Sequence, residues 1–147
     1  MEQIKLNRLE HLSADVEPDG RNARIKLFFS PEKNLAVRLD AGQRAAIPTG
    51  ISVELPRNIE GQVTISSTLA RSQSFVLLNS PGTIDPDYRG EIFVIVKNIS
   101  DEAVVLGAGT HIADMRFRPF VQATFLEVSE LDSSDRGIGG LGSTGTD

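Results

Sequence analysis

An acidic and an aromatic residue, Asp85 and Tyr88, stand three positions apart in a connection rich in turn-forming residues. This connection, residues 79–91, lies between two apolar runs, 75–78 and 92–96, whose β-branched and aromatic residues predict strands. A carboxylate can orient water or accept a hydrogen bond, and a ring can pack on a planar or sugar-like ligand, so the pair is suited to a small-molecule pocket. Residue types alone favour a plainer interpretation, a structural turn in which Asp85 caps its own backbone and Tyr88 covers the core.

Composition limits the classes of partner. The chain has 147 residues, enough for one domain with a core, a formal net charge of −5 and no cysteine. The cluster Arg21, Arg24 and Lys26 is short, so nucleic acid is not expected as a partner. The sequence begins without an apolar signal core and has no apolar stretch of 18 residues, so we expect a cytoplasmic protein without a membrane partner.

Most of the chain alternates apolar and polar residues with a period of two, which is typical of strands. The predicted strands are 3–9, 24–27, 35–39, 51–55, 62–65, 92–96, 103–106, 113–117 and 123–128. Their short length and regular spacing predict an all-β sandwich or barrel. A single short helix is expected at 67–73, with Ser67 as its N-cap.

The last sixteen residues differ in composition from the rest. Residues 132–147 are polar and glycine-rich, so alone they should be mobile, and we divide the chain into a β domain (1–131) and a C-terminal arm (132–147). Gly137, Gly139 and Gly142 match G-x-G-x-x-G by spacing. No strand within a βαβ unit precedes them, so they do not indicate a dinucleotide site.

Two segments carry a family resemblance. Residues 82–91, Gly-Thr-Ile-Asp-Pro-Asp-Tyr-Arg-Gly-Glu, resemble the third signature motif of the trimeric dUTPases (deoxyuridine triphosphate nucleotidohydrolases), and residues 136–145, Arg-Gly-Ile-Gly-Gly-Leu-Gly-Ser-Thr-Gly, resemble the fifth. With residues 47–51, Ile-Pro-Thr-Gly-Ile, the similarity extends from about residue 23 to the end. The resemblance implies a dUTPase-like jelly roll or β-barrel and a homotrimer. It also implies active sites at subunit boundaries, closed by the glycine-rich arm.

The nucleoside side of the implied site is retained. In the family, the backbone of a hairpin recognises uracil; this corresponds to Asn79 through Ile84, including Gly82. The resemblance makes Asp85 the base that orients water toward the α-phosphorus. It places Tyr88 under the deoxyribose, where a rigid ring disfavours a ribose 2′-hydroxyl.

The phosphate side departs from the family. The second motif, usually Pro-Arg-Ser-Gly-Leu-Ala, is Ile-Ser-Ser-Thr-Leu-Ala at 65–70, so Ser67 is kept at a helix N-terminus and the phosphate-binding arginine becomes Ser66. The first motif, usually Ala-Gly-x-Asp-Leu, is Ala-Arg-Ile-Lys-Leu at 23–27, and Lys26 replaces the aspartate that helps to hold hydrated magnesium. Loss of an arginine fork removes charge-assisted bonds of about 2–3 kcal/mol each.

The fourth and fifth motifs also differ. The fourth, usually Arg-Ile-Ala-Gln, is His-Ile-Ala-Asp at 111–114, where we expect a surface or hydrogen-bonded His111 rather than a ligand, and an Asp114 paired with Lys26 or Arg116. In the fifth, Leu141 replaces the phenylalanine that stacks on the base, a loss of about 1–3 kcal/mol.

The implied phosphate ligands are five side chains from the motifs and their surroundings: Lys26, Ser67, Arg71, Arg136 and Ser143. Lys26 could supply the charge of the metal, and Arg71 could reach back toward the missing arginine; a solvated strand lysine and an exposed helix arginine are the plain alternatives. No protein metal ligands are predicted. The cofactor is Mg²⁺ if the chain is active as in the family, or none because of Lys26.

Three functions remain open at this point. The leading hypothesis is a pseudoenzyme that binds a uracil-type nucleotide with weak or lost hydrolysis and serves in sequestration or regulation, with a regulatory protein partner. The second is an active dUTP diphosphatase that converts dUTP to dUMP and pyrophosphate. The third is a trimer that binds another protein and no nucleotide.

Overall fold

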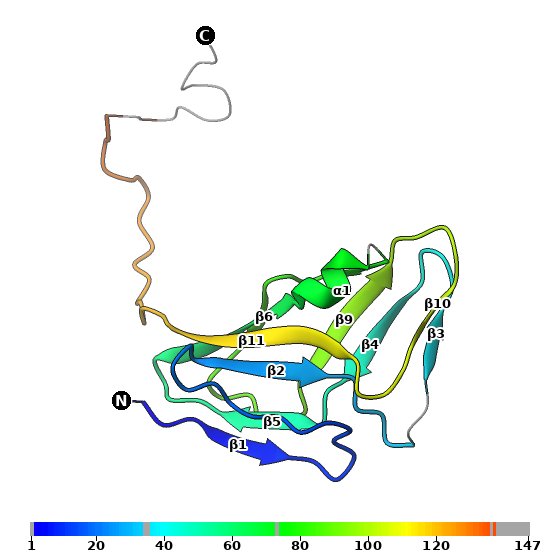
Figure 1. Cartoon of the computed structure of the whole chain (residues 1–147). Helices are drawn as coiled ribbons and strands as arrows, with labels where there is room; N and C mark the ends of the chain where they lie inside the picture. Colours follow the sequence, from blue (N-terminus) through cyan, green and yellow to red (C-terminus); the bar gives the residue numbers. More distant parts are fainter. Residues whose placement is uncertain (1, 34–35, 73, 136, 138–147) are drawn as a thin grey trace.

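The computed structural model of this chain describes residues 2–33, 36–72, 74–135 and 137. These residues form short strands and one five-residue helix, as the all-β prediction requires (Figure 1). The elements are β1 (Lys5–Arg8), β2 (Arg24–Phe28), β3 (Val37–Leu39), β4 (Arg44–Pro48), β5 (Ile51–Glu54), β6 (Ile59–Ile65), α1 (Ser67–Arg71), β7 (Phe75–Leu77), β8 (Gly82–Ile84), β9 (Phe93–Asn98), β10 (Val104–Leu106) and β11 (His111–Pro119). Within these residues, no helix is long and apolar enough to cross a membrane.

The strands pair antiparallel in four sheets around one core. The largest sheet has the order β2-β11-β6-β8, a second has β4-β9-β7, and two pairs, β1-β5 and β10-β3, complete the body. Alternation decides which side chains face inward: Ile25 and Leu27 of β2 are buried, whereas Lys26 between them is exposed. The apolar core side chains that are at most 1% exposed come from several strands and the loops beside them: Leu27, Ile47, Ile51, Ile92, Val94, Val96, Ile112, Ala113 and Met115.

A β-bulge interrupts the alternation at the start of β11. The pairing of β11 with β2 shifts register between His111 and Ala113, and Ile112 and Ala113 are both buried. In a regular strand, residues three apart point to opposite faces. The bulge instead brings His111 and Asp114 together, with His111 Nε2 3.4 Å from Asp114 Oδ1.

The connection between β7 and β8 is not the expected hairpin. Strand β7 pairs with β9 in one sheet, whereas β8 pairs with β6 in another. Residues 78–81 therefore carry the chain from one sheet to the next. Pro81 and Gly82 mark the point where the chain enters β8, but local turn chemistry does not determine which strand is the partner.

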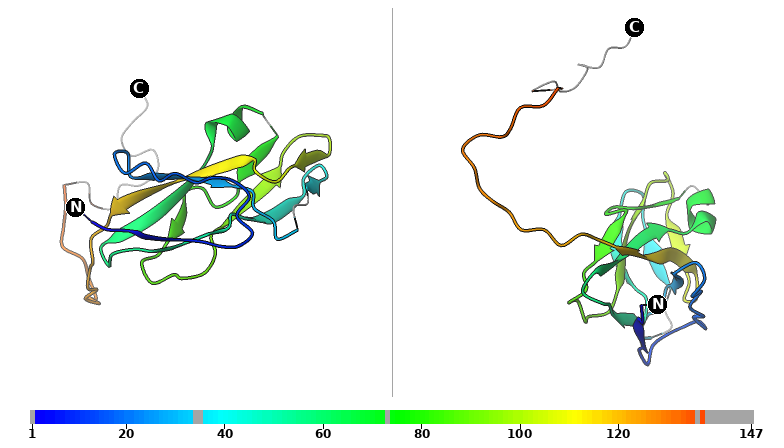
Figure 2. Two further views of the ribbon diagram at one scale, coloured as in Figure 1. Left: turned by 60° about the horizontal axis from the view of Figure 1, so that its bottom comes forward. Right: turned by 90° about the vertical axis from the view of Figure 1, so that its left-hand side faces the viewer.

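The strand predicted at 123–128 is wrong for the single chain. The last backbone hydrogen bond to the body joins Phe120 N to Asn58 O (3.0 Å), and the chain beyond it extends away without a neighbouring strand (Figure 2). Its apolar alternation fits a strand, but a strand needs a partner for its N–H and C=O groups. The division of the chain at residue 131 stays a prediction.

Candidate functional site

Three of the motif segments meet at one end of the four-stranded sheet. The residue after β6, Ser66, donates its N–H to Ile112 O (3.0 Å) and its hydroxyl to His111 O (2.9 Å) at the start of β11. The His111 ring lies 5.3 Å from the ring of Phe28 at the end of β2. The fold thus brings together the segments that correspond to the first, second and fourth motifs.

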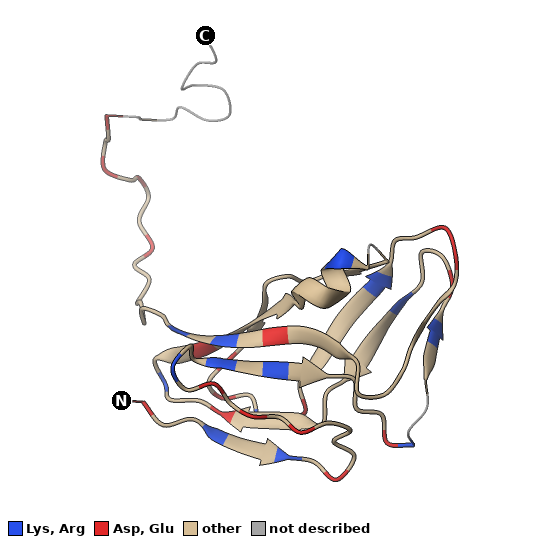
Figure 3. Ribbon diagram, viewed as in Figure 1, with Lys and Arg blue, Asp and Glu red and all other residues tan. Residues whose placement is uncertain are grey.

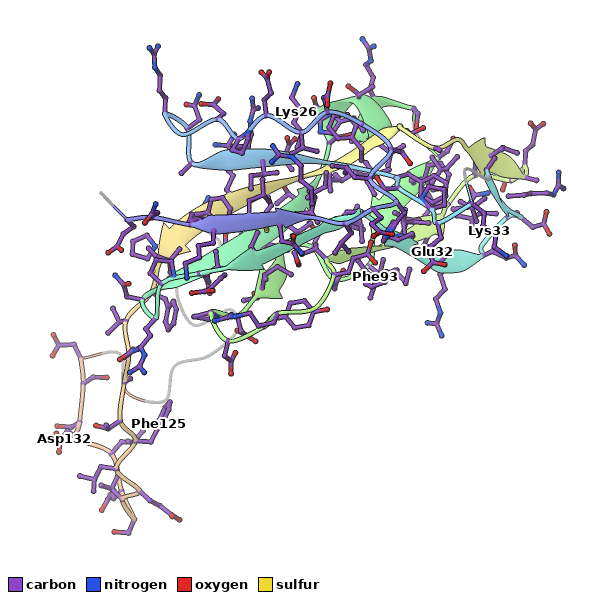
Figure 4. The ribbon with its side chains drawn as sticks, turned by 90° about the horizontal axis from the view of Figure 1, so that it is seen from below. Lys26, Glu32, Lys33, Phe93, Phe125 and Asp132 are labelled. Carbon is purple, nitrogen blue, oxygen red and sulfur yellow. The ribbon has the colours of Figure 1, made fainter. Side chains whose placement is uncertain are left out.

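A row of polar side chains crosses the outer face of this sheet. Lys26 of β2 is directly opposite Asp114 of β11, which is directly opposite Thr64 of β6. Directly opposed residues of antiparallel strands point to the same face, and the next residues along, such as Met115, fill the core instead. Figure 3 marks the positions of the charged residues along β2 and β11, and Figure 4 shows Lys26 on the side of β2 away from the core.

Asp114 makes a different contact from the one expected. Its nearest ion-pair contact is His111, at 3.4 Å, rather than Lys26 or Arg116, so the predicted pairing is wrong. Its Oδ1 is buried and has no hydrogen-bond partner within the described residues. His111 Nε2 lies 3.1 Å from Ala113 O and must donate to it, which confirms the prediction of a hydrogen-bonded histidine.

The neighbouring cation on β2 is already engaged. Arg24 Nη2 lies 3.7 Å from Asp19 Oδ2. Hydrogen bonds from the side chain and backbone of Asn22, together with the charge of Arg24, lower the pKa of Asp19. Lys26, in contrast, has no ion pair within 4 Å among the residues that the structure places, so its charge is available to a ligand.

Ser66, which stands where the motif resemblance expects an arginine, has a structural role. Ser66 is completely buried and is the N-cap of α1, where its hydroxyl oxygen accepts from Leu69 N (3.1 Å) while it donates to His111 O. The prediction of Ser67 as the cap is therefore wrong; Ser67 is the first helical residue and is exposed, as is Arg71 at the other end of α1. Ser66 cannot substitute for the arginine, and phosphate binding by Ser67 stays a prediction.

Ser66→Ala is expected to lower the free energy of unfolding by about 1–2 kcal/mol, because it removes the cap of α1 and its tie to β11. Ser67→Ala, the matched control, should change stability by less than about 0.5 kcal/mol because its side chain is exposed. Urea denaturation of both variants measures the difference. Equal losses for the two variants would contradict the assignment of the cap.

The Asp85–Tyr88 turn is closed by a backbone hydrogen bond and exposed to solvent. Tyr88 N donates to Asp85 O (3.2 Å), and both residues are exposed. Tyr88 is 42% exposed, so it does not cover the core as a purely structural turn would require. Its hydroxyl donates to Glu91 O (2.7 Å), and a Cβ at Gly90 would lie 2.5 Å from that hydroxyl oxygen, so the ring needs glycine there.

Residues 79–84, which precede this turn, are closely packed. Gly82 is buried, and a Cβ on it would lie 3.1 Å from Asn79 Nδ2. Ile84 is half-buried and packs against the core. The backbone from Asn79 to Ile84 is thus closely fitted next to the turn; its part in recognising uracil remains a prediction.

The two halves of the site are far apart within one chain. In the pairing of β6 with β8, Gly61 is opposite Ile84, so Asp85 follows at the level of Glu60, whereas Ser66 lies beyond the other end of β6. Thr64 of the polar row lies four residues along β6 from the level of Glu60, roughly 13 Å, and Lys26 on β2 lies three strands across the sheet from β8, roughly 14 Å. One chain alone therefore does not bring Asp85 to the polar row at Lys26.

Comparisons with known proteins agree with the motifs. The dUTPase family model matches residues 30–145. The deoxyuridine 5′-triphosphate nucleotidohydrolase of Rhizobium etli is 46% identical over 97% of this chain and 91% of its own length. That of Bdellovibrio bacteriovorus is 40% identical over 97% of this chain and 95% of its own length. This chain belongs to the dUTPase family.

Solved structures show the same fold. The dUTPase of Staphylococcus bacteriophage 80alpha, determined with dUPNHPP, superposes with a TM-score of 0.83 over 99% of this chain and all of the phage chain, at 21% identity. A variant of the dUTPase from S. aureus phage phi11, reported with a structural Mg(II) ion, has a TM-score of 0.76 over 89% of this chain and 99% of its own, at 18% identity. The chain therefore has the dUTPase jelly-roll fold.

The metal of the dUTPase family does not fit the residues found here. Mg²⁺ prefers carboxylate and water oxygens, but Lys26 stands where the motif resemblance expects an aspartate, and Asp114 is the carboxylate that faces it across the sheet. Among the described residues, no three His, Cys, Asp or Glu side chains could together hold a metal ion. We therefore assign no metal ligands to this chain.

Some of the predicted site residues lie outside the part of the chain that the structure describes, and other residues near the site were not predicted. Arg136, Leu141 and Ser143 lie outside the described residues. Sequence reasoning missed Glu91 and His11, which contact each other behind Tyr88. The pair is separated by 80 positions, so no local pattern signals it.

Proposed function

We propose that this chain hydrolyses dUTP to dUMP and pyrophosphate. The observation that carries this proposal is the 46% identity, over 97% of the chain, to a protein named as a deoxyuridine 5′-triphosphate nucleotidohydrolase. The exposed Asp85–Tyr88 turn supports it. The comparisons favour hydrolysis, so this second hypothesis now takes precedence over nucleotide binding with weak or lost hydrolysis.

In the proposed mechanism, Asp85 supplies the base. Its carboxylate orients a water molecule toward the α-phosphorus and accepts the proton as the new P–O bond forms and pyrophosphate leaves. Tyr88 forms the floor under the deoxyribose. Because its hydroxyl is fixed to Glu91 O, the ring resists displacement by a ribose 2′-hydroxyl.

Positive side chains hold the triphosphate on the other side of the site. Lys26 faces outward without a close anionic partner among the described residues, and Ser67 and Arg71 are exposed on the adjacent helix. We propose that Lys26 supplies the positive charge that a metal ion supplies elsewhere in the family, and that Arg136 and Ser143 of the arm add phosphate contacts. Leu141 would then cover the base.

A homotrimer would complete this site. The halves carrying Asp85 and Lys26 are separated within one chain, so a second copy has to contribute one of them. The segment beyond β11 also presents apolar side chains to solvent, among them Phe125, which is 98% exposed, and Leu131, which is 84% exposed. Apolar side chains exposed to this degree fit burial against other copies.

Incubation of the pure protein with dUTP, with and without Mg²⁺, tests the proposal. We expect catalytic formation of dUMP, measured by anion-exchange chromatography of the free and the protein-retained nucleotide. Unconverted dUTP released from the denatured protein would instead support the binding protein, which the replacements Ser66 and Lys26 favour. No retained nucleotide, together with no rise in melting temperature, would favour the trimer that binds another protein.

A further inference from the structure

Glu91 connects the Tyr88 turn to two distant parts of the chain. Its Oε1 accepts from Gly50 N (2.7 Å) and faces His11 Nε2 (2.9 Å), while its backbone oxygen accepts from the Tyr88 hydroxyl (2.7 Å). The Glu91 and His11 side chains are only 15% and 16% exposed. Since an ionised carboxylate only accepts, His11 Nε2 must carry the hydrogen of this contact.

The segment around Gly50 is closely fitted to both neighbours. Leu9 N donates to Gly50 O (2.9 Å), and Ile92 N donates to Ile51 O (2.8 Å). Gly50 has φ +68°, and a Cβ there would lie 2.9 Å from Leu12 Cα, so no side chain fits at this position. The Glu91 carboxylate therefore binds to a rigid support rather than to a loose loop.

Three charged residues lie near His11 besides Glu91. Glu10, Glu32 and Lys33 line, with His11, a surface hollow of about 430 Å³ on the other side of the imidazole. Figure 4 shows Glu32 and Lys33 in the loop that follows β2. Among the described residues, the hydrogen bond of the His11 imidazole is with Glu91, so the ring is oriented toward the Tyr88 turn.

We propose that Glu91 is a positioning residue for nucleoside specificity, and that His11 and Gly50 are its anchors. It fixes residues 88–91, and with them the Tyr88 ring that is to distinguish deoxyribose from ribose. This inference rests on the proposed function, because it assigns the ring to the sugar site. A change of about 1 Å in the placement of a site group can alter rates by about 10²-fold, so loosening this tie should be measurable in specificity.

The test compares Glu91→Ala and Glu91→Gln in the full-length protein, with kcat and KM measured for both dUTP and UTP. We expect Glu91→Ala to lower the ratio of kcat/KM for dUTP over UTP at least about tenfold, mainly through the KM for dUTP. Glu91→Gln retains an oxygen acceptor for Gly50 N and should lose less. Glu102→Gln, a substitution of an exposed glutamate, is the matched control and should leave the ratio unchanged.

Two substitutions at His11 test the same hydrogen bond with Glu91 from the side of the donor. His11→Gln keeps an N–H donor for Glu91 and should retain the ratio, whereas His11→Ala should lower it. A folded Glu91→Ala variant with the wild-type ratio would overturn the inference. If Glu91→Ala does not fold, an unchanged ratio in both Glu91→Gln and His11→Ala would overturn it.

A failure of the proposed function would give a different result in this experiment. In that case the wild-type protein itself would not convert dUTP. The inference is then tested by calorimetry, which measures the ratio of dUMP affinity to UMP affinity in the same variants. A lowered ratio in Glu91→Ala supports the role of Glu91, and an unchanged ratio refutes it.

Discussion

Asp85→Asn should lower the turnover of dUTP by about 10²–10⁴-fold while leaving nucleotide affinity nearly unchanged. The amide has the shape of the carboxylate but cannot accept the proton of the attacking water. Asp85 is exposed directly after β8, so its neighbours need not rearrange and the fold should be kept. Single-turnover rates give the chemical step, and calorimetry with dUMP gives the affinity.

Asp87→Asn is the matched control for this experiment. Asp87 lies in the same turn, is exposed and carries the same charge, but it is not the residue that the family motif assigns as base. It should retain turnover within a few-fold of wild type. Full turnover in Asp85→Asn, or an equal loss in both variants, would remove Asp85 from the proposed mechanism.

The features predicted correctly from the sequence are those fixed by local chemistry. Alternation identified β2 because Ile25 and Leu27 must be buried while Lys26 remains solvated. The turn between Asp85 and Tyr88 follows from its own proline and backbone hydrogen bond. Such features depend on residues close in sequence, and the motifs placed them in the right order.

The features that were missed depend on contacts between distant residues. Ser66 and Ser67 are equally good caps by type, and the hydroxyl contact with His111 O selects the first of them. The bulge that brings Asp114 next to His111 has no sequence signal, so Lys26 or Arg116 was predicted as its partner. For the apolar pattern at 123–128, the sequence specified a strand without specifying whether a partner strand exists in the same chain.

Lys26→Asp should make the binding of a triphosphate depend on magnesium. In the wild type, a non-hydrolysable dUTP analogue should bind about equally well in EDTA and in Mg²⁺, because the ammonium group carries the compensating charge. In the variant, a second carboxylate lies directly across the sheet from Asp114, and this pair repels phosphate unless a cation intervenes. Affinity in EDTA should fall about 10- to 100-fold, and Mg²⁺ should restore most of it.

Isothermal titration with and without Mg²⁺ measures this change independently of turnover. Lys33→Asp is the control, because it makes the same change in net charge at an exposed lysine beside the His11 hollow rather than on the outer face of β2. It should leave the magnesium dependence as in the wild type. A wild-type protein that already requires Mg²⁺ for binding would show that Lys26 does not act as the cation of the phosphate site. The metal would then have to be held by the nucleotide itself or by residues of another subunit.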